Sequence, residues 1–323
     1  MDTVAPGALA GLSRGHGRPW ARYKVSGRGF FSEFNILAFA LAHCLVHGRR
    51  LCVDISNSAG PWRQLFPGLP RGAAERPETD GSAEEISLEP KLPDWSWNPQ
   101  WAAMRKQVRD GCLEARRVGV PELGFEGSYS ELVVLAARTL FQPNATLVER
   151  AAAARRELEL DGRPYAAVQL RRGDKVEGYD NGRGRFLVET EIADFAAYAE
   201  CLEKLAPDIS DVFVIADDYT AVEDARSGHP RFRFHTLCEP HERGYFHAVQ
   251  QDAAPEIKLA NLEKLLITVL IAIGSEAFVG TYWSNLSIGV YLLHPHQDRC
   301  AAMDLARPWS PYDPLFMRGR DEL

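Results

Sequence analysis

Short apolar runs alternate with longer apolar-periodic segments through the second half of the chain. Short runs of this kind are typical of buried strands, and the longer segments between them are typical of helices. The strands are expected at 165–170, 212–216, 231–237 and 276–280, and the helices at 191–205, 220–227, 256–273 and 284–293. Strands that alternate with helices predict a parallel sheet with right-handed crossovers.

The first half begins with the same alternation. A strand at Tyr23–Val25, a helix at Asn35–His47 and a strand at Leu51–Ile55 predict a Rossmann-like βαβ unit. Residues 67–99 are rich in proline, glutamate, glycine and serine and carry no period, so we expect a long loop there. Two more helices are expected, at 130–141 and 146–159.

Composition and charge narrow the class of protein. The chain has 323 residues, of which 46% are hydrophobic, so it can bury a sizeable core as two domains or as one large α/β unit. Its formal net charge of −7 argues against nucleic acid as a bulk partner. The longest apolar run, Leu265–Ile273, is too short to span a membrane. The six cysteines form no C-x-x-C pair, and buried free thiols are the default expectation.

Signals for a cellular compartment point in two directions. The N-terminus lacks the apolar core of a signal peptide, so the chain as it stands is expected to be cytoplasmic. The C-terminal Arg320-Asp321-Glu322-Leu323 is a variant of an endoplasmic-reticulum retention signal, and Asn144-Ala145-Thr146 is a glycosylation sequon. If an N-terminal signal precedes this sequence, these features point to the secretory pathway instead.

A cluster of charged residues follows the strand at 165–170. Arg171, Arg172, Asp174 and Lys175 come directly after it. Arginine offers a planar fork of donors that matches phosphate, and lysine adds a point charge. Ligands of open α/β sheets bind at the carboxyl ends of strands, so the cluster predicts a site for an anion such as a diphosphate. The alternative is a solvated, ion-paired strand end.

A second anion-binding candidate lies where the strand at 276–280 turns into a helix. Thr281, Ser284 and Asn285 lie at this turn. The start of a helix offers free amide donors and the positive end of its dipole to an anion. The alternative is that Ser284 and Asn285 only cap the helix.

Two adjacent aspartates, Asp217 and Asp218, end the strand at 212–216. Such a pair invites a metal-site interpretation. Adjacent residues of a strand point to opposite faces, however, which makes sharing one ion awkward. We therefore expect no metal.

A glycine-rich turn near the N-terminus leaves a different class of function open. Gly27, Gly29 and Ser32 approach the pattern G-x-G-x-x-G, and Asp54 ends the next strand. This arrangement is compatible with dinucleotide binding and hence with an NAD(P)-dependent oxidoreductase. The third glycine of the pattern is missing.

Four segments, in order over roughly residues 22–295, resemble signatures of the α1,6-fucosyltransferases and of the wider group that includes the α1,2- and protein O-fucosyltransferases. The segments are Gly27–Asn35, Leu140–Val176, Val212–Asp218 and Phe278–Asn285. The second contains Gln169-Leu170-Arg171-Arg172-Gly173-Asp174-Lys175, where the wider group has His-x-Arg-Arg-x-Asp. The lysine after the aspartate favours the α1,6 branch.

The resemblance implies a GT-B fold, in which two Rossmann-like domains with parallel sheets face each other across a cleft. Residues 1–145 would form the acceptor-side domain and 146–300 the domain that binds the GDP-sugar. Residues 301–323 would form a C-terminal tail that could pack back on the first domain. Trp95, Trp97 and Trp101 would either pin the long loop to the core or stack on a sugar.

The implied function is an inverting, metal-independent transfer of L-fucose from GDP-fucose to a hydroxyl of a glycan or glycoprotein acceptor, without a cofactor. The catalytic residues would be Arg171, with Glu177 or Asp180 as the base. The donor-binding residues would be Gln169, Arg171, Arg172, Asp174, Lys175, Asp217, Asp218, Thr281, Ser284 and Asn285. The residues on the acceptor side of the cleft would be Gly27, Gly29, Phe30 and Asn35. The alternatives are a protein O-fucosyltransferase, another GDP-sugar transferase, or a degenerate module that binds nucleotide or glycan without turnover.

The chain departs from the family pattern at three places. Gln169 stands where the family has histidine, and an amide can form hydrogen bonds but does not titrate. Thr268 stands near the position of a family acidic residue, for which Glu263 is an approximate substitute. Tyr179 stands at the position of the proposed base, so these changes leave a shifted substrate or a reduced activity open.

Overall fold

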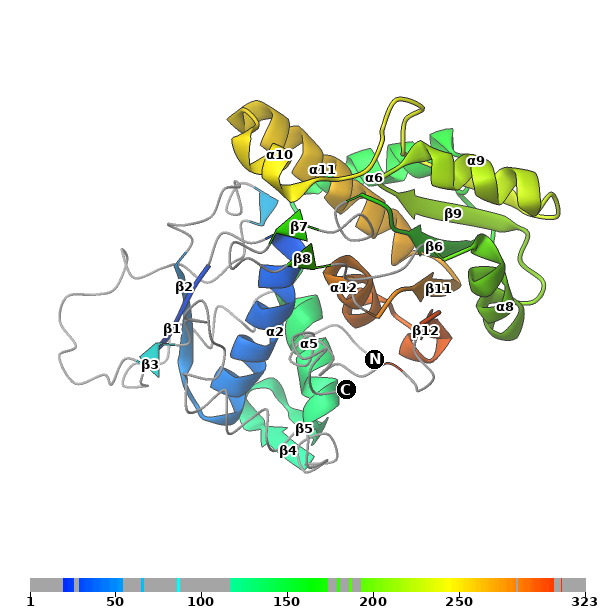
Figure 1. The fold of residues 1–323 in the computed structure, drawn as a ribbon. Coiled ribbons are helices and arrows are strands. Elements are labelled where there is room, and N and C mark those ends of the chain that lie inside the picture. The colour runs from blue at the N-terminus through cyan, green and yellow to red at the C-terminus, as the bar shows by residue number, and fades with distance from the viewer. Residues whose placement is uncertain are drawn as a thin grey trace. The chain divides into compact units, whose positions relative to one another are not determined.

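The computed structural model describes residues 20–25, 29–54, 65–66, 86–87, 117–173, 179–180, 186–187, 193–282, 284–304 and 309. The chain divides into two compact units: unit 1 comprises Met1–Asn144 together with Ser310–Leu323, and unit 2 comprises Ala145–Trp309. Figure 1 labels most of the helices and strands of both units. No helix in the described ranges is both long and apolar enough to cross a membrane.

Unit 1 is built on a parallel sheet and a buried helix. The sheet has the strand order β2-β1-β3, with β1 at Trp20–Lys24, β2 at Arg50–Asp54 and β3 at Ile86–Ser87. Helix α2 (Phe30–Val46) connects β1 to β2, which confirms the expected βαβ opening. It begins five residues before the expected start, because Phe30, Phe31 and Phe34 are part of its apolar surface.

Among the described residues of unit 1, a second helix and the hairpin before it pack on α2. Helix α5 (Tyr129–Leu140) packs against it, and a hairpin of β4 (Arg117–Val120) and β5 (Phe125–Ser128) precedes α5, with a short 3-10 helix at Pro121–Leu123 between the strands. Ser128 and Glu131 cap α5 reciprocally, and the Glu131 carboxylate accepts the Ser128 amide at 2.7 Å. Covered in this way, α2 buries even Glu33, whose carboxylate accepts the Tyr23 hydroxyl at 2.7 Å.

Unit 2 is a parallel α/β sheet with the strand order β10-β9-β6-β11-β12. Its strands are β6 (Ala166–Leu170), β9 (Asp211–Ala216), β10 (Arg233–Thr236), β11 (Ala277–Gly280) and β12 (Cys300–Ala302). Its helices are α6 (Ala145–Glu157), α8 (Phe195–Leu205), α9 (Tyr219–Gly228), α10 (His247–Asp252), α11 (Pro255–Ala272), α12 (Asn285–Leu293) and a short 3-10 helix at Gln297–Arg299. Two-residue strands β7 (Tyr179–Asp180) and β8 (Phe186–Leu187) pair with each other.

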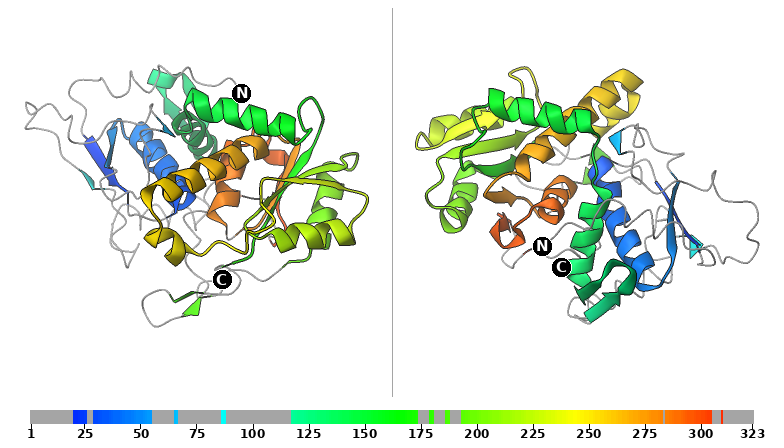
Figure 2. Two further views of the ribbon diagram at one scale, coloured as in Figure 1. Left: turned by 90° about the horizontal axis from the view of Figure 1, so that it is seen from above. Right: turned by 180° about the vertical axis from the view of Figure 1, so that it is seen from behind.

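Helices cover both faces of this sheet. Ala166, Val168 and Leu170 of β6 join one core with side chains of α8 and α9. On the other face α11 contacts β6 and β9, and α6 packs along α11, as Figure 2 shows. This two-sided cover explains why the strands read as continuous apolar runs in the sequence.

Candidate functional site

The order of the crossovers in unit 2 reverses beside β6. The chain passes from β6 to β9 and β10 on one side, and then returns to β11 and β12 on the other. The carboxyl ends of β6 and β11 therefore border the switch point, at which ligands of doubly wound sheets bind. In the sequence, polar residues follow both strands. In the structure β6 pairs with β11 in parallel, so the carboxyl ends of the two strands are neighbours.

Gln169 joins the two sides of the switch point. Its side chain is 3% exposed, and its carbonyl oxygen accepts a hydrogen bond from the Ser287 hydroxyl of α12. The same hydroxyl oxygen accepts the Thr281 amide at 3.1 Å. A side chain at Gly280 would collide with Ser287, so the close contact requires glycine there. Gln169 is thus a buried link between β6 and the start of α12.

Two side chains, those of Ser284 and Asp304, accept backbone amides at the start of α12 and in the turn before it. Ser284 is the N-cap, and its side chain accepts the Ser287 amide at 3.4 Å. In the turn before it, the Tyr282 amide donates to the Asp304 carboxylate at 2.7 Å. Asp304 follows β12, so the neighbouring strand fixes the turn that leads into this helix.

At the carboxyl end of β6, Arg171 is held by an ion pair to Asp217. The Arg171 guanidinium lies 2.9 Å from the Asp217 carboxylate, and the two side chains are 16% and 12% exposed. The guanidinium also lies over the Tyr245 ring, 5.4 Å from its centroid. Arg172 points to a different partner, Asp224 of α9, at 3.4 Å. The two guanidinium groups thus pair with different carboxylates.

The Asp217 carboxylate also accepts two backbone amides. One oxygen accepts the Arg172 amide at 2.8 Å and the other the Tyr245 amide at 3.2 Å. Asp218 serves another element, because its carboxylate caps α9 and accepts the Thr220 amide at 2.8 Å. The adjacent aspartates therefore have separate roles, with Asp217 joining the ends of β6 and β9 to the segment around Tyr245.

Two glycines bring this segment against the end of β6. Gly173 has φ +65° and Gly244 has φ +83°, a conformation that favours glycine. A side-chain carbon on Gly244 would lie 2.9 Å from the Gly173 Cα. The two backbones are therefore in contact, and neither position has room for a side chain.

The remaining predicted residues are placed as follows. Gly29 is the N-cap residue of α2, and Phe30 and Asn35 are buried in unit 1. The Phe30 ring stacks on the Phe66 ring, with 5.4 Å between the ring centroids. Asp180 lies in β7. Gly27, Asp174, Lys175, Glu177 and the three tryptophans lie outside the described residues.

The structure adds residues that the sequence reasoning missed. Ser287 and Tyr245 had no motif of their own, and Asp304 follows a three-residue strand that was not expected. A weak signal existed for Ser287, because it lies three residues after the N-cap Ser284, at a position whose backbone amide such a cap accepts. Glu263, the approximate substitute for the family carboxylate, pairs with Arg150 of α6 at 2.5 Å.

Comparisons with known proteins bear on the fold. No protein-family model matches the chain, and no curated protein matches it in sequence. A variant of Arabidopsis thaliana FUT1 in complex with GDP matches in structure with a TM-score of 0.50 and 12% identity, covering 89% of this chain and 72% of that one. NodZ α1,6-fucosyltransferase soaked with GDP-fucose gives 0.48 and 16%, covering 86% and 93%. POFUT1 in complex with GDP gives 0.42 and 13%, covering 89% and 99%.

The likeness to the FUT1 structure shows that this chain shares its fold. Together with the parallel sheets of both units, it confirms the expected α/β fold class. The cleft between the two halves and the domain limits expected from the sequence stay predictions.

Proposed function

We propose that this chain is an inverting, metal-independent fucosyltransferase that takes GDP-fucose as its donor. The observation that carries the proposal concerns the carboxyl ends of the inner strands β6 and β11 of unit 2. Arg171 is held by Asp217 at the end of β6, and α12 starts beyond the end of β11. The FUT1 structure, which has the same fold, contains GDP. The sugar is inferred from the four segments that resemble the fucosyltransferases.

In the proposed reaction the Arg171 guanidinium contacts the β-phosphate, and the amides at the start of α12 contact the diphosphate. An acceptor hydroxyl attacks the anomeric carbon on the face opposite GDP, so an oxygen–carbon bond forms as the bond to the β-phosphate breaks. The hydroxyl proton passes to a carboxylate, for which Glu177 and Asp180 are the candidates. GDP leaves with the electron pair, and Arg171 stabilises the negative charge that develops on it.

A thermal-shift panel of GDP, UDP, CMP, ADP and NADH tests the donor class. We expect GDP alone to raise the melting temperature strongly, because a ligand at 100 times its Kd adds about 2.7 kcal/mol to the stability of the folded state. A shift with NADH and none with GDP would favour the oxidoreductase suggested by the glycine-rich turn. Equal shifts with all nucleotides would show only a general phosphate site.

Turnover is tested separately, by measuring GDP release from GDP-fucose in the presence of glycan and glycopeptide acceptors. We expect release that depends on the acceptor. GDP binding without release from any acceptor would identify a binding module instead. Release with unglycosylated protein acceptors alone would favour the protein O-fucosyltransferase alternative.

Turnover is expected to persist in excess chelator. Arginine and lysine side chains can neutralise a diphosphate without an ion, and Arg171 and Lys175 follow one strand. The measurement is the initial rate before and after dialysis against EDTA. A rate that is lost in chelator and returns with manganese or magnesium would contradict the metal-independent mechanism.

A further inference from the structure

Residues 237–246 follow β10 and contact the donor-site candidates Arg171 and Asp217. We refer to this segment as the β10 loop. Its second half lies against the carboxyl end of β9. The Tyr219 amide donates to the Glu242 carbonyl at 3.1 Å, and the Gly244 amide donates to the Asp217 carbonyl at 2.9 Å. Gly244 then contacts Gly173, and the Tyr245 ring lies beside the Arg171 guanidinium.

The loop is anchored at its start by β10 itself. The Thr236 hydroxyl donates to the Val214 carbonyl of β9 at 2.8 Å and accepts the Cys238 amide at 3.0 Å. These contacts fix the first residues of the loop on the sheet. They do not reach its second half, which carries Gly244 and Tyr245.

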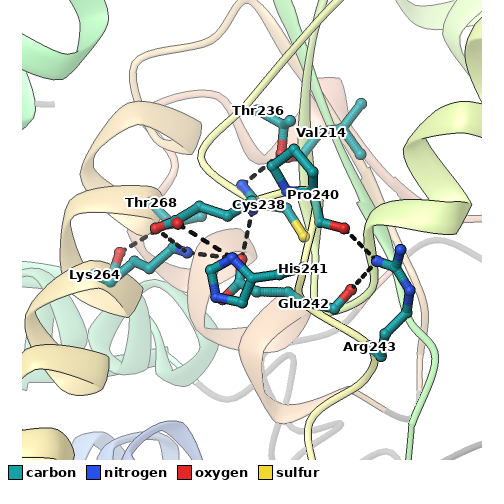
Figure 3. Close-up of polar contacts among 10 residues, drawn as sticks. Val214, Thr236, Cys238, Pro240, His241, Glu242, Arg243, Lys264 and Thr268 are labelled. Carbon is teal, nitrogen blue, oxygen red and sulfur yellow. Dashed lines mark hydrogen bonds and ion pairs between the residues drawn. The ribbon is translucent and has the colours of Figure 1, made fainter.

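The second half is anchored on helix α11 by Lys264, as Figure 3 shows. The Lys264 ammonium donates to the Glu242 carboxylate at 2.7 Å, and the same carboxylate oxygen accepts the Glu239 amide at 2.7 Å. Burial opposes ionisation of Glu242, but the hydrogen bonds from Lys264 and from the Glu239 amide hold its pKa below the usual range. Burial and the nearby Glu242 carboxylate raise the pKa of Cys238 to about 12, so this thiol stays protonated beside the ion pair.

A neighbouring ion pair on the same helix provides a matched comparison. Glu263 of α11 pairs with Arg150 of α6 at 2.5 Å, so this pair joins two helices and does not involve the β10 loop. Both pairs are partly exposed, with Lys264 and Glu242 at 34% and 33% and Arg150 and Glu263 at 50% and 23%. Partly exposed ion pairs contribute little to stability. A specific effect of Lys264 on ligand binding would therefore have to come from the position in which it holds the β10 loop.

We propose that Lys264 is a positioning residue for the donor site: through Glu242 it fixes the β10 loop, and through Tyr245 the loop braces the Arg171 guanidinium. The inference rests on the proposed function, because it takes Arg171 as the group that meets the diphosphate. It assigns a role to a residue of α11 that acts on the strand end through the β10 loop.

Isothermal titration of GDP into the full chain tests the inference. Lys264→Met should weaken GDP binding about 3–10-fold, because the interaction energies between residues of one hydrogen-bond network commonly correspond to affinity changes of this size. Lys264→Arg keeps the charge near Glu242 and should restore most of the affinity. Arg150→Met, which removes a cation from the neighbouring pair, should change the affinity less than about 2-fold. Melting temperatures of the three variants should lie close together.

A double-mutant cycle separates positioning from a general structural effect. If Lys264 acts through Arg171, Lys264→Met should have little further effect on GDP affinity in an Arg171→Lys background. The same loss in both backgrounds would overturn the inference, as would a Lys264→Met variant with wild-type affinity. If the unaltered chain does not bind GDP, the proposed function fails as well, so the two failures are distinguishable.

Discussion

Arg171→Lys is expected to lower turnover about 10²–10³-fold while it weakens GDP binding much less. Negative charge builds on the β-phosphate as the glycosidic bond breaks, so a donor fixed beside it contributes most in the transition state. Arg171 is fixed in this way, because the Asp217 carboxylate holds its guanidinium at 2.9 Å and both side chains are largely buried. Lysine keeps the charge but loses the planar fork that can meet a carboxylate and a phosphate together.

The matched control is Arg172→Lys, measured by the same steady-state kinetics. Arg172 has the neighbouring place in the sequence, but its guanidinium points to Asp224, whose side chain is 71% exposed. Its substitution should therefore change turnover far less. If Arg171→Lys kept normal turnover and Arg172→Lys lost it, the roles of the two arginines would be reversed. Full activity in both variants would show that this strand end is not the donor site.

Gly173→Ala is expected to destabilise unit 2 by roughly 2–4 kcal/mol. Gly173 has φ +65°, and an alanine methyl group would lie 2.6 Å from the carbonyl oxygen and 2.7 Å from the amide nitrogen of Tyr245. These contacts are with backbone, which cannot rotate away as a side chain can. The substitution must therefore push the β10 loop from the end of β6, with loss of the contacts that Asp217 makes.

Urea denaturation of the full chain measures the effect, with Gly228→Ala as the control. Gly228 ends α9, where the added carbon would meet nothing within 4 Å beyond its own stretch of helix, and its φ is not in the left-handed region. Alanine there should leave the stability unchanged or raise it by about 0.4–1 kcal/mol. If Gly173→Ala were as stable as Gly228→Ala, the contact between the two backbones would not exist in solution.

The sequence predicts the second unit well because its strands carry a strong local signal. Strands β6, β9 and β11 are buried on both faces and read as short apolar runs, so their positions are confirmed within a residue or two. The helix expected at 191–205 begins at Phe195, because the Asp194 side chain caps it and accepts the Ala196 amide at 3.2 Å. A capping aspartate is a signal that the expected boundary overlooked.

The elements that escaped sequence reasoning are short ones. The β4–β5 hairpin has four-residue strands that contain Gly119 and Gly127, and β12 has three residues. Helix α10 has six residues, fewer than two turns, so no helical period can be read from it. Such elements are stabilised by the surfaces on which they pack, and those surfaces come from distant parts of the chain.

The same distinction applies to the candidate site. The charged cluster at Arg171 and the polar turn at Ser284 are local motifs, and the structure puts both at the predicted strand ends. The strand order that makes them neighbours is set by pairing between distant segments. The contact of Lys264 with Glu242 spans 22 residues, and no pattern in either segment indicates it.

The link between Gln169 and Ser287 has a consequence for protein engineering. These residues are 118 positions apart, yet the hydroxyl of one and the amide of the other share a hydrogen bond in a buried space. Histidine at position 169, as the fucosyltransferase pattern has it, would have to accept the proton that the Ser287 hydroxyl now donates to Gln169, while the hydroxyl oxygen accepts the Thr281 amide. A combinatorial library that seeks new donor specificity should therefore randomise positions 169 and 287 as a pair, since each residue is the other's buried hydrogen-bond partner.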